Sequence, residues 1–445
     1  MPPDSNLLHP LRAGPASSTS LLRALQLPRP TLARALQDLQ REGEVLKVGA
    51  PRGARYALPR NVRGAGSSWP VYQIDAAGRV HPFGRLDALM PRHFHFETSH
   101  SALRGLSEGL PWFLHALRPS GFLARAADLE PLAGTSASPG DNLDDAQIAW
   151  VTREGWDGPG DLIVGAEALE AWRAARDHRN VVEARNRPRQ YMRLAEAALE
   201  RAIAPQAQLP GEAPKFTALT DQGGHIVQVL VKFSAPIATP EGQRQGELLL
   251  AEHLAHGYLN ARGVCAVHSR LFRFGGRIFL EIDRFDRVGA DGRRSVTSLA
   301  ALGLPQSGQS HGWAAAASQL SGAGVLPRND ARQIRLVEAF SELIGNIDRG
   351  PEDLTLFHRA DGRFALAPAY DLSPSVFTTA DADVRFVAPA PSAATADVWQ
   401  QAVCLAEGYW ERLAAEPQFS TGFREQCSAA LAALRAMPQA VPLAH

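Results

Sequence analysis

Three aspartates in the C-terminal part of the chain stand at turn positions from which they could bind a metal ion and phosphate groups. Asp348 directly follows an apolar run with helical spacing, Asp353 comes shortly after it, and Asp371 follows a predicted hairpin. Mg²⁺ prefers hard oxygen ligands, and phosphoryl transfer is catalysed mainly by positioning and charge neutralisation. We therefore expect Asp348 to orient an attacking hydroxyl group, and Asp353 and Asp371 to hold Mg²⁺. The alternative is that these acids only cap helices and turns.

Lysine is rare in this chain and therefore informative. The 46 basic residues include only three lysines, Lys47, Lys215 and Lys232. A lysine retained among so many arginines is a candidate for a task that a guanidinium group cannot perform. Lys232 ends a predicted strand, 225–232, and Glu247 lies in the first turn of a predicted helix, 245–259. In protein kinases a helix glutamate directs a strand lysine toward the nucleotide phosphates, although such a pair also occurs by chance.

The elements that would carry these residues follow one another in the order found in protein kinases. Residues 331–347 predict a largely buried helix that leads to Asp348, and 354–357 and 364–367 predict two strands joined by a turn. Protein kinases have a catalytic aspartate, a nearby metal ligand, and a second metal-binding aspartate further along the chain. Residues 277–287 predict a strand with a charged and aromatic end, where a hinge would contact adenine.

The first 60 residues form a separate, basic unit. They hold nine Lys or Arg and four Asp or Glu, a net charge of +5, whereas the whole chain has a net charge of 0. Residues 20–25 and 31–41 predict two helices, and 45–48 and 55–58 predict two strands around a basic turn. This order resembles a winged helix-turn-helix with 30–40 as the recognition helix, which predicts DNA binding or the docking of a protein partner. The candidate DNA-binding residues are Arg29, Thr31, Arg34, Arg52 and Arg55.

Three short motifs extend the similarity to a family. They are Ile344-Gly345-Asn346-Ile347-Asp348, Ala367-Pro368-Ala369-Tyr370-Asp371-Leu372 and Asp283-Arg284-Phe285-Asp286-Arg287. With these motifs, residues 70–435 resemble the HipA family of serine/threonine kinases, which are toxins of type II toxin–antitoxin pairs. The basic unit ahead of them looks like that of the subfamily called YjjJ or HipH. The resemblance implies an α+β, two-lobed, protein-kinase-like fold, the use of ATP and Mg²⁺, a protein substrate and an antitoxin partner.

The resemblance also implies roles for individual residues. Asp348 matches the catalytic base and Asp371 the metal ligand, and Asp353 stands where a second metal-binding residue is expected. Lys232 matches the phosphate-binding lysine and Glu247 its helix glutamate. The remaining ATP-binding positions are Gly211 and Lys215 in the loop over the phosphates, and Asp283 and Phe285 at the hinge.

Two regions depart from the family pattern. The family usually has Asp-x-His-x-x-Asn in the catalytic loop, whereas this chain has Gly350 for the histidine and Asp353 for the asparagine. The aspartate adds a negative charge near phosphate, which can slow turnover, change the metal preference or abolish activity. Gln208 stands where HipA has the serine that it autophosphorylates. The alternative hypothesis is therefore a DNA-binding regulator with a nucleotide-binding pseudokinase domain, and a small-molecule kinase is a third.

Length and composition limit the remaining classes. A chain of 445 residues, 45% hydrophobic and 21% charged, is expected to form two or three globular domains. We assign 1–62 to a winged helix-turn-helix, 70–165 to a HipA N-terminal subdomain, 166–290 to a kinase N-lobe and 291–445 to a mainly helical C-lobe. The three cysteines fit neither a zinc site nor a disulfide framework, and neither a membrane-length apolar run nor a secretion signal is visible. We expect a cytoplasmic protein without a membrane partner.

Overall fold

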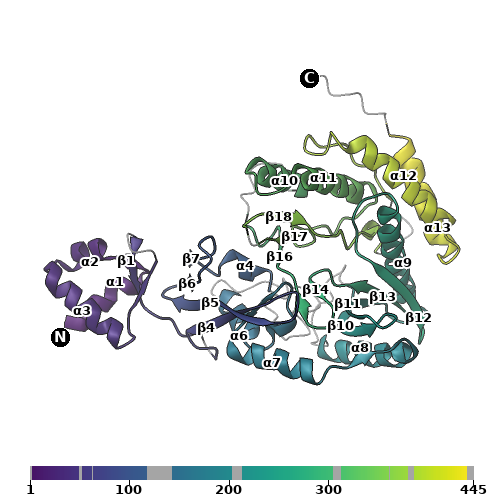
Figure 1. Cartoon of the computed structure of the whole chain (residues 1–445). Coiled ribbons are helices and arrows are strands. Elements are labelled where there is room, and N and C mark those ends of the chain that lie inside the picture. The colour runs from purple at the N-terminus through teal and green to yellow at the C-terminus, as the bar shows by residue number, and fades with distance from the viewer. Residues whose placement is uncertain are drawn as a thin grey trace. The chain divides into compact units, whose positions relative to one another are not determined.

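The computed structural model describes residues 3–49, 53–62, 64–117, 143–202, 213–303, 312–359, 361–378 and 385–437 (Figure 1). These residues divide into two units. The first unit comprises the described residues up to Arg179 together with Asp291–Arg293, and the second comprises Asn180–Ala290 and the described residues from Arg294 onward. None of the described helices has both the length and the apolar composition needed to span a membrane.

Three helices and a three-stranded antiparallel sheet form the N-terminal part of the first unit. In chain order these are α1 (Pro3–Arg12), β1 (Ala16–Ser17), α2 (Ser18–Leu25), α3 (Arg29–Arg41), β2 (Leu46–Val48) and β3 (Arg55–Ala57), and the strand order is β1-β3-β2. On α3, Leu32, Leu36 and Leu39 recur at helical spacing and are buried against leucines of α1 and α2. The two helices and two strands predicted here are confirmed. α1 and the short β1 were not predicted.

A five-stranded antiparallel sheet, in the order β7-β6-β5-β4-β8, forms the rest of the first unit. Its strands are β4 (Ser68–Ile74), β5 (Val80–Leu89), β6 (His93–Glu97), β7 (Gly105–Glu108) and β8 (Leu162–Val164), and the unit also contains α4 (Trp112–His115), α6 (Leu143–Val151), α7 (Ala166–Asp177) and β15 (Gly292–Arg293). Leu169 and Trp172 of α7 pack against Ile74 and Ile163 of the sheet. The sequence predicts that the residues of α7 belong to the kinase N-lobe. This apolar contact instead makes the helix part of the first unit.

The second unit begins with a sheet of order β12-β13-β11-β10-β9. Its elements are β9 (Val181–Val182), α8 (Arg187–Ala202), β10 (Lys215–Asp221), β11 (Ile226–Phe233), α9 (Pro240–Asn260), β12 (Ser269–Phe274), β13 (Arg277–Asp283) and β14 (Arg287–Val288). Tyr191 of α8 packs on one face of the sheet with Phe233 and Phe279, and Leu249 of α9 packs on the other with Leu280. Figure 1 shows these two helices on opposite sides of the strands.

The register of this sheet determines where its lysines lie. Lys215 and Lys232 are direct cross-strand partners, and Lys232 is also paired with Leu280. Side chains alternate between the two faces of a strand, and directly paired residues share a face. Both lysines are therefore on the face covered by α9.

Helices and a small sheet complete the second unit. They are β16 (Val296–Ser298), α10 (Trp313–Gly322), α11 (Arg328–Leu343), β17 (Thr355–His358), β18 (Phe364–Leu366), α12 (Trp399–Ala415) and α13 (Thr421–Arg435). The predicted hairpin is confirmed as β17 and β18, which pair antiparallel. The buried Tyr409 and Trp410 of α12 donate hydrogen bonds to the carbonyls of Ala251 (2.9 Å) and Leu343 (3.0 Å). These bonds connect α12 to α9 and to α11.

Candidate active site

Lys232 lies at the centre of the candidate site. Its side chain is 7% exposed, and its Nζ donates to both carboxylate oxygens of Glu252 at 2.8 and 2.9 Å and to Oδ1 of Asp371 at 2.6 Å. Burial alone would lower the pKa of a lysine. The two carboxylates outweigh that effect, so the pKa of Lys232 is raised above its ordinary value. Lys232 is therefore a buried ammonium group held by acids from two distant segments.

Glu252, not Glu247, is the helix partner of Lys232. The two glutamates are about 140° apart around the axis of α9, so both cannot face the same strand. Leu249, Glu252, His253 and His256 recur at the spacing of one helix face, and Leu249 of that face packs on the sheet. The prediction that Glu247 holds Lys232 is therefore wrong, because Glu247 lies on a different face of α9.

Glu247 has a different task. It accepts a hydrogen bond from the backbone N–H of Ser420 at 3.0 Å and lies 3.5 Å from Arg244. Ser420 caps α13, so Glu247 connects α9 to the C-terminal helix. The sequence does contain a signal for Glu252: it is an acid in an otherwise apolar run, Leu248-Leu249-Leu250-Ala251-Glu252. A buried acid in such a run requires a partner.

The loop after α11 carries Asp348 and is fixed by two buried polar residues. Gly345, with φ +69°, ends the helix, and the backbone N–H groups of Ile347 and Asp348 donate to Oγ of Ser375 at 2.9 and 3.2 Å. Nδ2 of Asn346 donates to the carbonyl oxygen of Asp371 at 3.0 Å. The loop of Asp348 and the segment of Asp371 are thus held in one hydrogen-bond network, which no local pattern in the sequence predicts.

The pKa values of Asp348 and Asp353 are both raised. Asp348 is exposed, yet partial desolvation raises its pKa, the hydrogen bond with Ser375 opposes this, and the charge of Asp371 adds to it. Asp353 accepts a hydrogen bond from the N–H of Gly350 at 2.8 Å. Burial and the negative charge of Asp371 raise the pKa of Asp353 to about 7. Asp371 therefore lies close enough to Asp348 and to Asp353 for its charge to raise the pKa of each.

Asp371 is the acid of this group that stays ionised most readily. Burial would raise its pKa, but the positive charges of Lys232 and Lys215 lower it below the ordinary value. Its backbone has φ +57°, a left-handed conformation that is uncommon outside glycine and asparagine. Its side chain is 45% exposed, so one carboxylate both contacts the buried lysine and reaches solvent.

The carboxylates of Asp353 and Asp371 are chemically suited to binding Mg²⁺. They are hard oxygen donors, and the charge of Asp371 adds to burial in raising the pKa of Asp353; a divalent cation would relieve this excess of negative charge. Among the described residues there is no group of three or more His, Cys, Asp or Glu side chains arranged around a metal position. Mg²⁺ in phosphoryl-transfer sites is usually held by one or two carboxylates together with phosphates and waters.

The predicted hinge residues lie on different sides of the sheet. The Asp283 carboxylate accepts hydrogen bonds from Arg270 and from Nε2 of Gln222, the latter at 3.1 Å. By strand alternation it points to the face opposite Lys232, so its side chain does not join the lysine. Phe285 does lie near the site: its ring centroid is 5.8 Å from that of Tyr370, the residue before Asp371. Gly211 lies outside the described residues.

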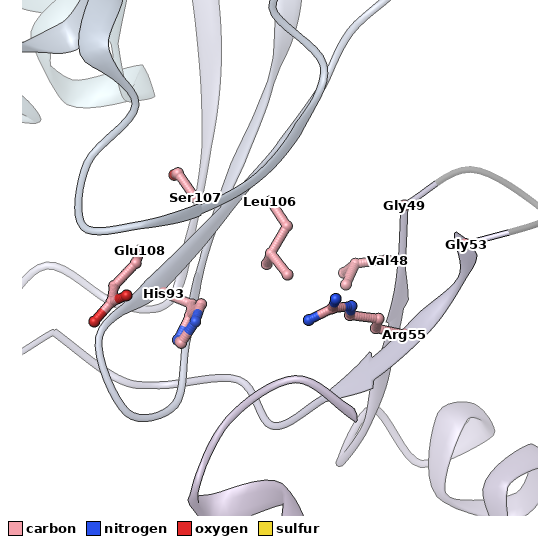
Figure 2. A pocket seen from close by; sticks show the side chains of 8 residues that line it. All are labelled: Val48, Gly49, Gly53, Arg55, His93, Leu106, Ser107 and Glu108. Atoms are coloured by element: carbon pink, nitrogen blue, oxygen red, sulfur yellow. The ribbon is translucent and has the colours of Figure 1, made fainter. Parts of the chain in front are cut away.

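Three of the predicted DNA-binding residues are exposed on α3, namely Arg29, Thr31 and Arg34. Arg52 lies outside the described residues. Arg55 is exposed on β3 and lines a cavity of about 330 Å³ between the β2–β3 hairpin and strands β6 and β7. Figure 2 shows its guanidinium group directed toward Leu106. Arg55 therefore lines this cavity, whereas Arg29, Thr31 and Arg34 are exposed on α3.

Comparison with known families matches two long segments of the chain. Residues 65–173 match the family described as the middle domain of YjjJ-like toxins, and residues 207–441 match the HipA-like C-terminal domain. A protein called Toxin YjjJ from Escherichia coli (strain K12) is 31% identical over 428 residues, which cover 94% of this chain and 95% of that protein.

Two solved structures are also similar to the chain. One is the Shewanella oneidensis MR-1 toxin–antitoxin system of HipA, HipB and operator DNA, with a TM-score of 0.47 and 12% identity over 83% of this chain and 96% of that one. The other is the Helicobacter pylori proinflammatory kinase CtkA, with a TM-score of 0.36 and 11% identity over 52% of this chain and 91% of that one.

A double-mutant cycle tests the partner of Lys232. Because Glu252 contacts the buried ammonium directly, Lys232→Met and Glu252→Gln are expected to show a coupling of about 1–3 kcal/mol in the free energy of unfolding, measured by urea denaturation. Lys232→Met and Glu247→Gln are the matched control, with a coupling below about 0.5 kcal/mol. Equal couplings in the two cycles would contradict the assignment of Glu252.

Asp353→Asn is expected to stabilise the protein in a pH-dependent way. Because the pKa of Asp353 is raised from 3.8 to about 7, its ionisation destabilises the folded state progressively as the pH rises between these values. The neutral amide removes this cost, and with allowance for solvent screening the gain is about 1–2 kcal/mol at pH 8. The gain should be much smaller at pH 4.5, as measured by urea denaturation.

The control for this prediction is Asp361→Asn. Asp361 is an exposed aspartate in the turn between β17 and β18. Its replacement should change the free energy of unfolding by less than about 0.5 kcal/mol at either pH. A gain from Asp353→Asn that is the same at both pH values would show that ionisation of Asp353 is not its source.

Proposed function

The chain belongs to the YjjJ-like toxin family and carries a HipA-like C-terminal domain, and from this premise we propose that it is an ATP- and Mg²⁺-dependent serine/threonine protein kinase. Membership of this family confirms the resemblance that the three sequence motifs indicated. The observation that best supports the kinase proposal is the buried contact of Lys232 with both Glu252 and Asp371. A lysine fixed between a helix glutamate and a metal-binding aspartate is the arrangement that kinases use.

The lysines would bind the phosphates of ATP. Lys232 keeps its positive charge in spite of burial, and Glu252 restricts the orientation of its flexible side chain. Lys215, its direct partner across the sheet, adds a second cation on the same face. Gly211, which precedes Lys215 in the chain, remains a proposed contact of the phosphates. Binding at these groups would place the triphosphate against the face of the sheet that α9 covers.

The purine ring would lie near Phe285. The rings of Phe357 and Tyr370 pack around Phe285 at centroid distances of 5.9 and 5.8 Å, and this apolar group is contiguous with the core beside Lys232. Because the Asp283 carboxylate is engaged by Arg270 and Gln222, we propose that Asp283 contributes through its backbone.

Asp348 would act as the catalytic base. Its raised pKa brings it closer to neutral pH, which makes the carboxylate a better proton acceptor. The serine or threonine oxygen of a protein substrate would form the new bond to the γ-phosphorus, the bond to ADP would break, and the hydroxyl proton would pass to Asp348. Asp371 and Asp353 would hold Mg²⁺, whose charge offsets that of the phosphates.

The first unit would supply DNA recognition. Its N-terminal elements have the order expected of a winged helix-turn-helix, and Arg29, Thr31 and Arg34 are exposed on α3, the second of two successive helices. We propose that this domain binds DNA chiefly through α3. By family membership we further propose that the protein acts as a toxin with an antitoxin partner.

A pseudokinase that regulates through DNA is the second candidate. The observation that favours it is the carboxylate of Asp353 at the position where the family has an amide, since this carboxylate has a pKa of about 7 and adds charge beside Asp371. Such a protein would bind nucleotide without transferring phosphate.

A phosphate-transfer assay separates the two candidates. Wild-type protein with Mg²⁺ and γ-labelled ATP is expected to label itself or proteins of a cell lysate. Asp348→Asn should lower the labelling at least 100-fold while Mg-ATP still raises the melting temperature, because the base acts only in the chemical step. Lys232→Met should abolish both the labelling and the rise in melting temperature with Mg-ATP. ATP binding without labelling would favour the pseudokinase, and neither binding nor labelling would refute both proposals.

DNA binding is tested with two arginines of α3. Arg34→Ala is expected to weaken binding about three- to tenfold and to lower the dependence of log Kd on log salt by about one unit, because it removes one phosphate contact. Arg41 is the matched control: it is exposed near the end of the same helix and is paired with Asp38 at 3.0 Å. Arg41→Ala should change binding less than twofold. Equal effects, measured by fluorescence anisotropy, would argue against α3 as the DNA-reading helix.

A further inference from the structure

Two histidines of α9 converge on one serine behind the candidate site. Nδ1 of His253 and Nδ1 of His256 lie 2.9 and 3.0 Å from Oγ of Ser269, the first residue of β12. His256 is 1% exposed. Its Nε2 lies 3.8 Å from Oε1 of Glu252 and has no hydrogen-bond partner within the described part of the chain. A continuous row of polar groups therefore runs from His253 through Ser269 and His256 to the carboxylate that holds Lys232.

The chemistry of a hydroxyl group limits how these hydrogen bonds can be arranged. Ser269 has one proton, so it donates to one histidine and accepts an N–H from the other. If it donates to His256, the proton of that neutral imidazole is on Nε2 and faces Glu252. In the reverse arrangement a lone pair of Nε2 would face the carboxylate, which is repulsive. Electrostatics therefore selects the first arrangement, with His253 carrying its proton on Nδ1.

The surroundings of His256 keep it neutral. Burial, the charge of Lys232 and the neighbouring His253 together lower the pKa of His256 to about 3, against the weaker effect of Asp371. Glu252 is itself buried, and burial raises its pKa although Lys232 opposes this. A neutral N–H directed at a buried carboxylate stabilises its ionised form without adding a second cation.

We propose that His256 is a positioning residue, whose Nε2–H, oriented by Ser269, keeps the Glu252 carboxylate on Lys232. The 3.8 Å between Nε2 of His256 and Oε1 of Glu252 is longer than a hydrogen bond. In the free protein the N–H dipole therefore interacts with the charge of the carboxylate without a hydrogen bond. Contacts in active sites are often long before the substrate binds and shorten in the complex. The consequence for catalysis rests on the proposed function, whereas the proton position does not.

NMR of the full chain labelled with ¹⁵N-histidine tests the proton position. At pH 7 the expected result is an Nε2–H imidazole for His256 and an Nδ1–H imidazole for His253, assigned by comparison with His256→Gln and His253→Gln. An Nδ1–H tautomer or an imidazolium at His256 would overturn the proposal whether or not the protein is a kinase.

Two amide substitutions test the positioning role. The Gln side chain in His256→Gln can place an N–H where Nε2 of the histidine lies. The shorter side chain in His256→Asn reaches only the position of Nδ1, near Ser269. We expect His256→Gln to keep the KM for ATP within about threefold of wild type, and His256→Asn to raise it about tenfold with kcat changed less than twofold. Both variants should remain folded at the assay temperature, as their melting temperatures show, and His225→Asn, at an exposed histidine, serves as the control.

The outcomes remain distinguishable from failure of the proposed function. Equal KM values for the two His256 variants would refute the positioning role in an active kinase. If the wild-type protein has no kinase activity, the urea midpoints of His256→Asn, Glu252→Gln and the double variant provide the readout. A non-additive shift supports the contact between His256 and Glu252, and an additive shift overturns it.

Discussion

The burial of a single ammonium group is the constraint on which the second unit depends. Removing a charge from water is costly, and the cost is recovered only when opposite charges and hydrogen bonds meet it with good geometry. For Lys232 these come from α9 and from the segment of Asp371, which are separated from β11 by very different lengths of chain. The site can therefore form only when sheet, helix and C-terminal segment are correctly packed. Tyr409 and Trp410 support this packing by connecting α12 to α9 and α11.

The same constraint divides the acids of the site into two groups. Glu252 is fully engaged by Lys232, whereas Asp371 contacts the lysine and is also partly exposed. Asp353 and Asp348 have no direct contact with the ammonium group and carry raised pKa values. Carboxylates therefore outnumber lysines in the site. The Mg²⁺ that we propose to bind here would offset this excess of negative charge. The same excess explains why an aspartate at position 353 is electrostatically less favourable than an asparagine.

The sequence predicted those parts of the site that depend on local pattern. The aspartates follow recognisable elements, the hairpin of β17 and β18 is signalled by alternation around a turn, and Lys232 is conspicuous because lysine is rare. Position in the first turn of the predicted helix favours Glu247, whereas the helical phase places Glu252 on the face that contacts Lys232. The face reached by Asp283 depends on strand register, and the roles of Asn346 and Ser375 depend on tertiary contacts between distant segments. No local pattern in the sequence contains that information.

The left-handed backbone of Asp371 restricts the evolution of this position. A side chain here must tolerate φ +57° and must also be short enough to reach Lys232 from that backbone. Glycine, asparagine and aspartate meet the first requirement most easily, and glutamate meets neither well. If this carboxylate is lost in a relative that keeps the fold, asparagine or glycine is therefore the expected replacement. Any other residue at this position would strain the backbone and would indicate that the local structure has changed as well.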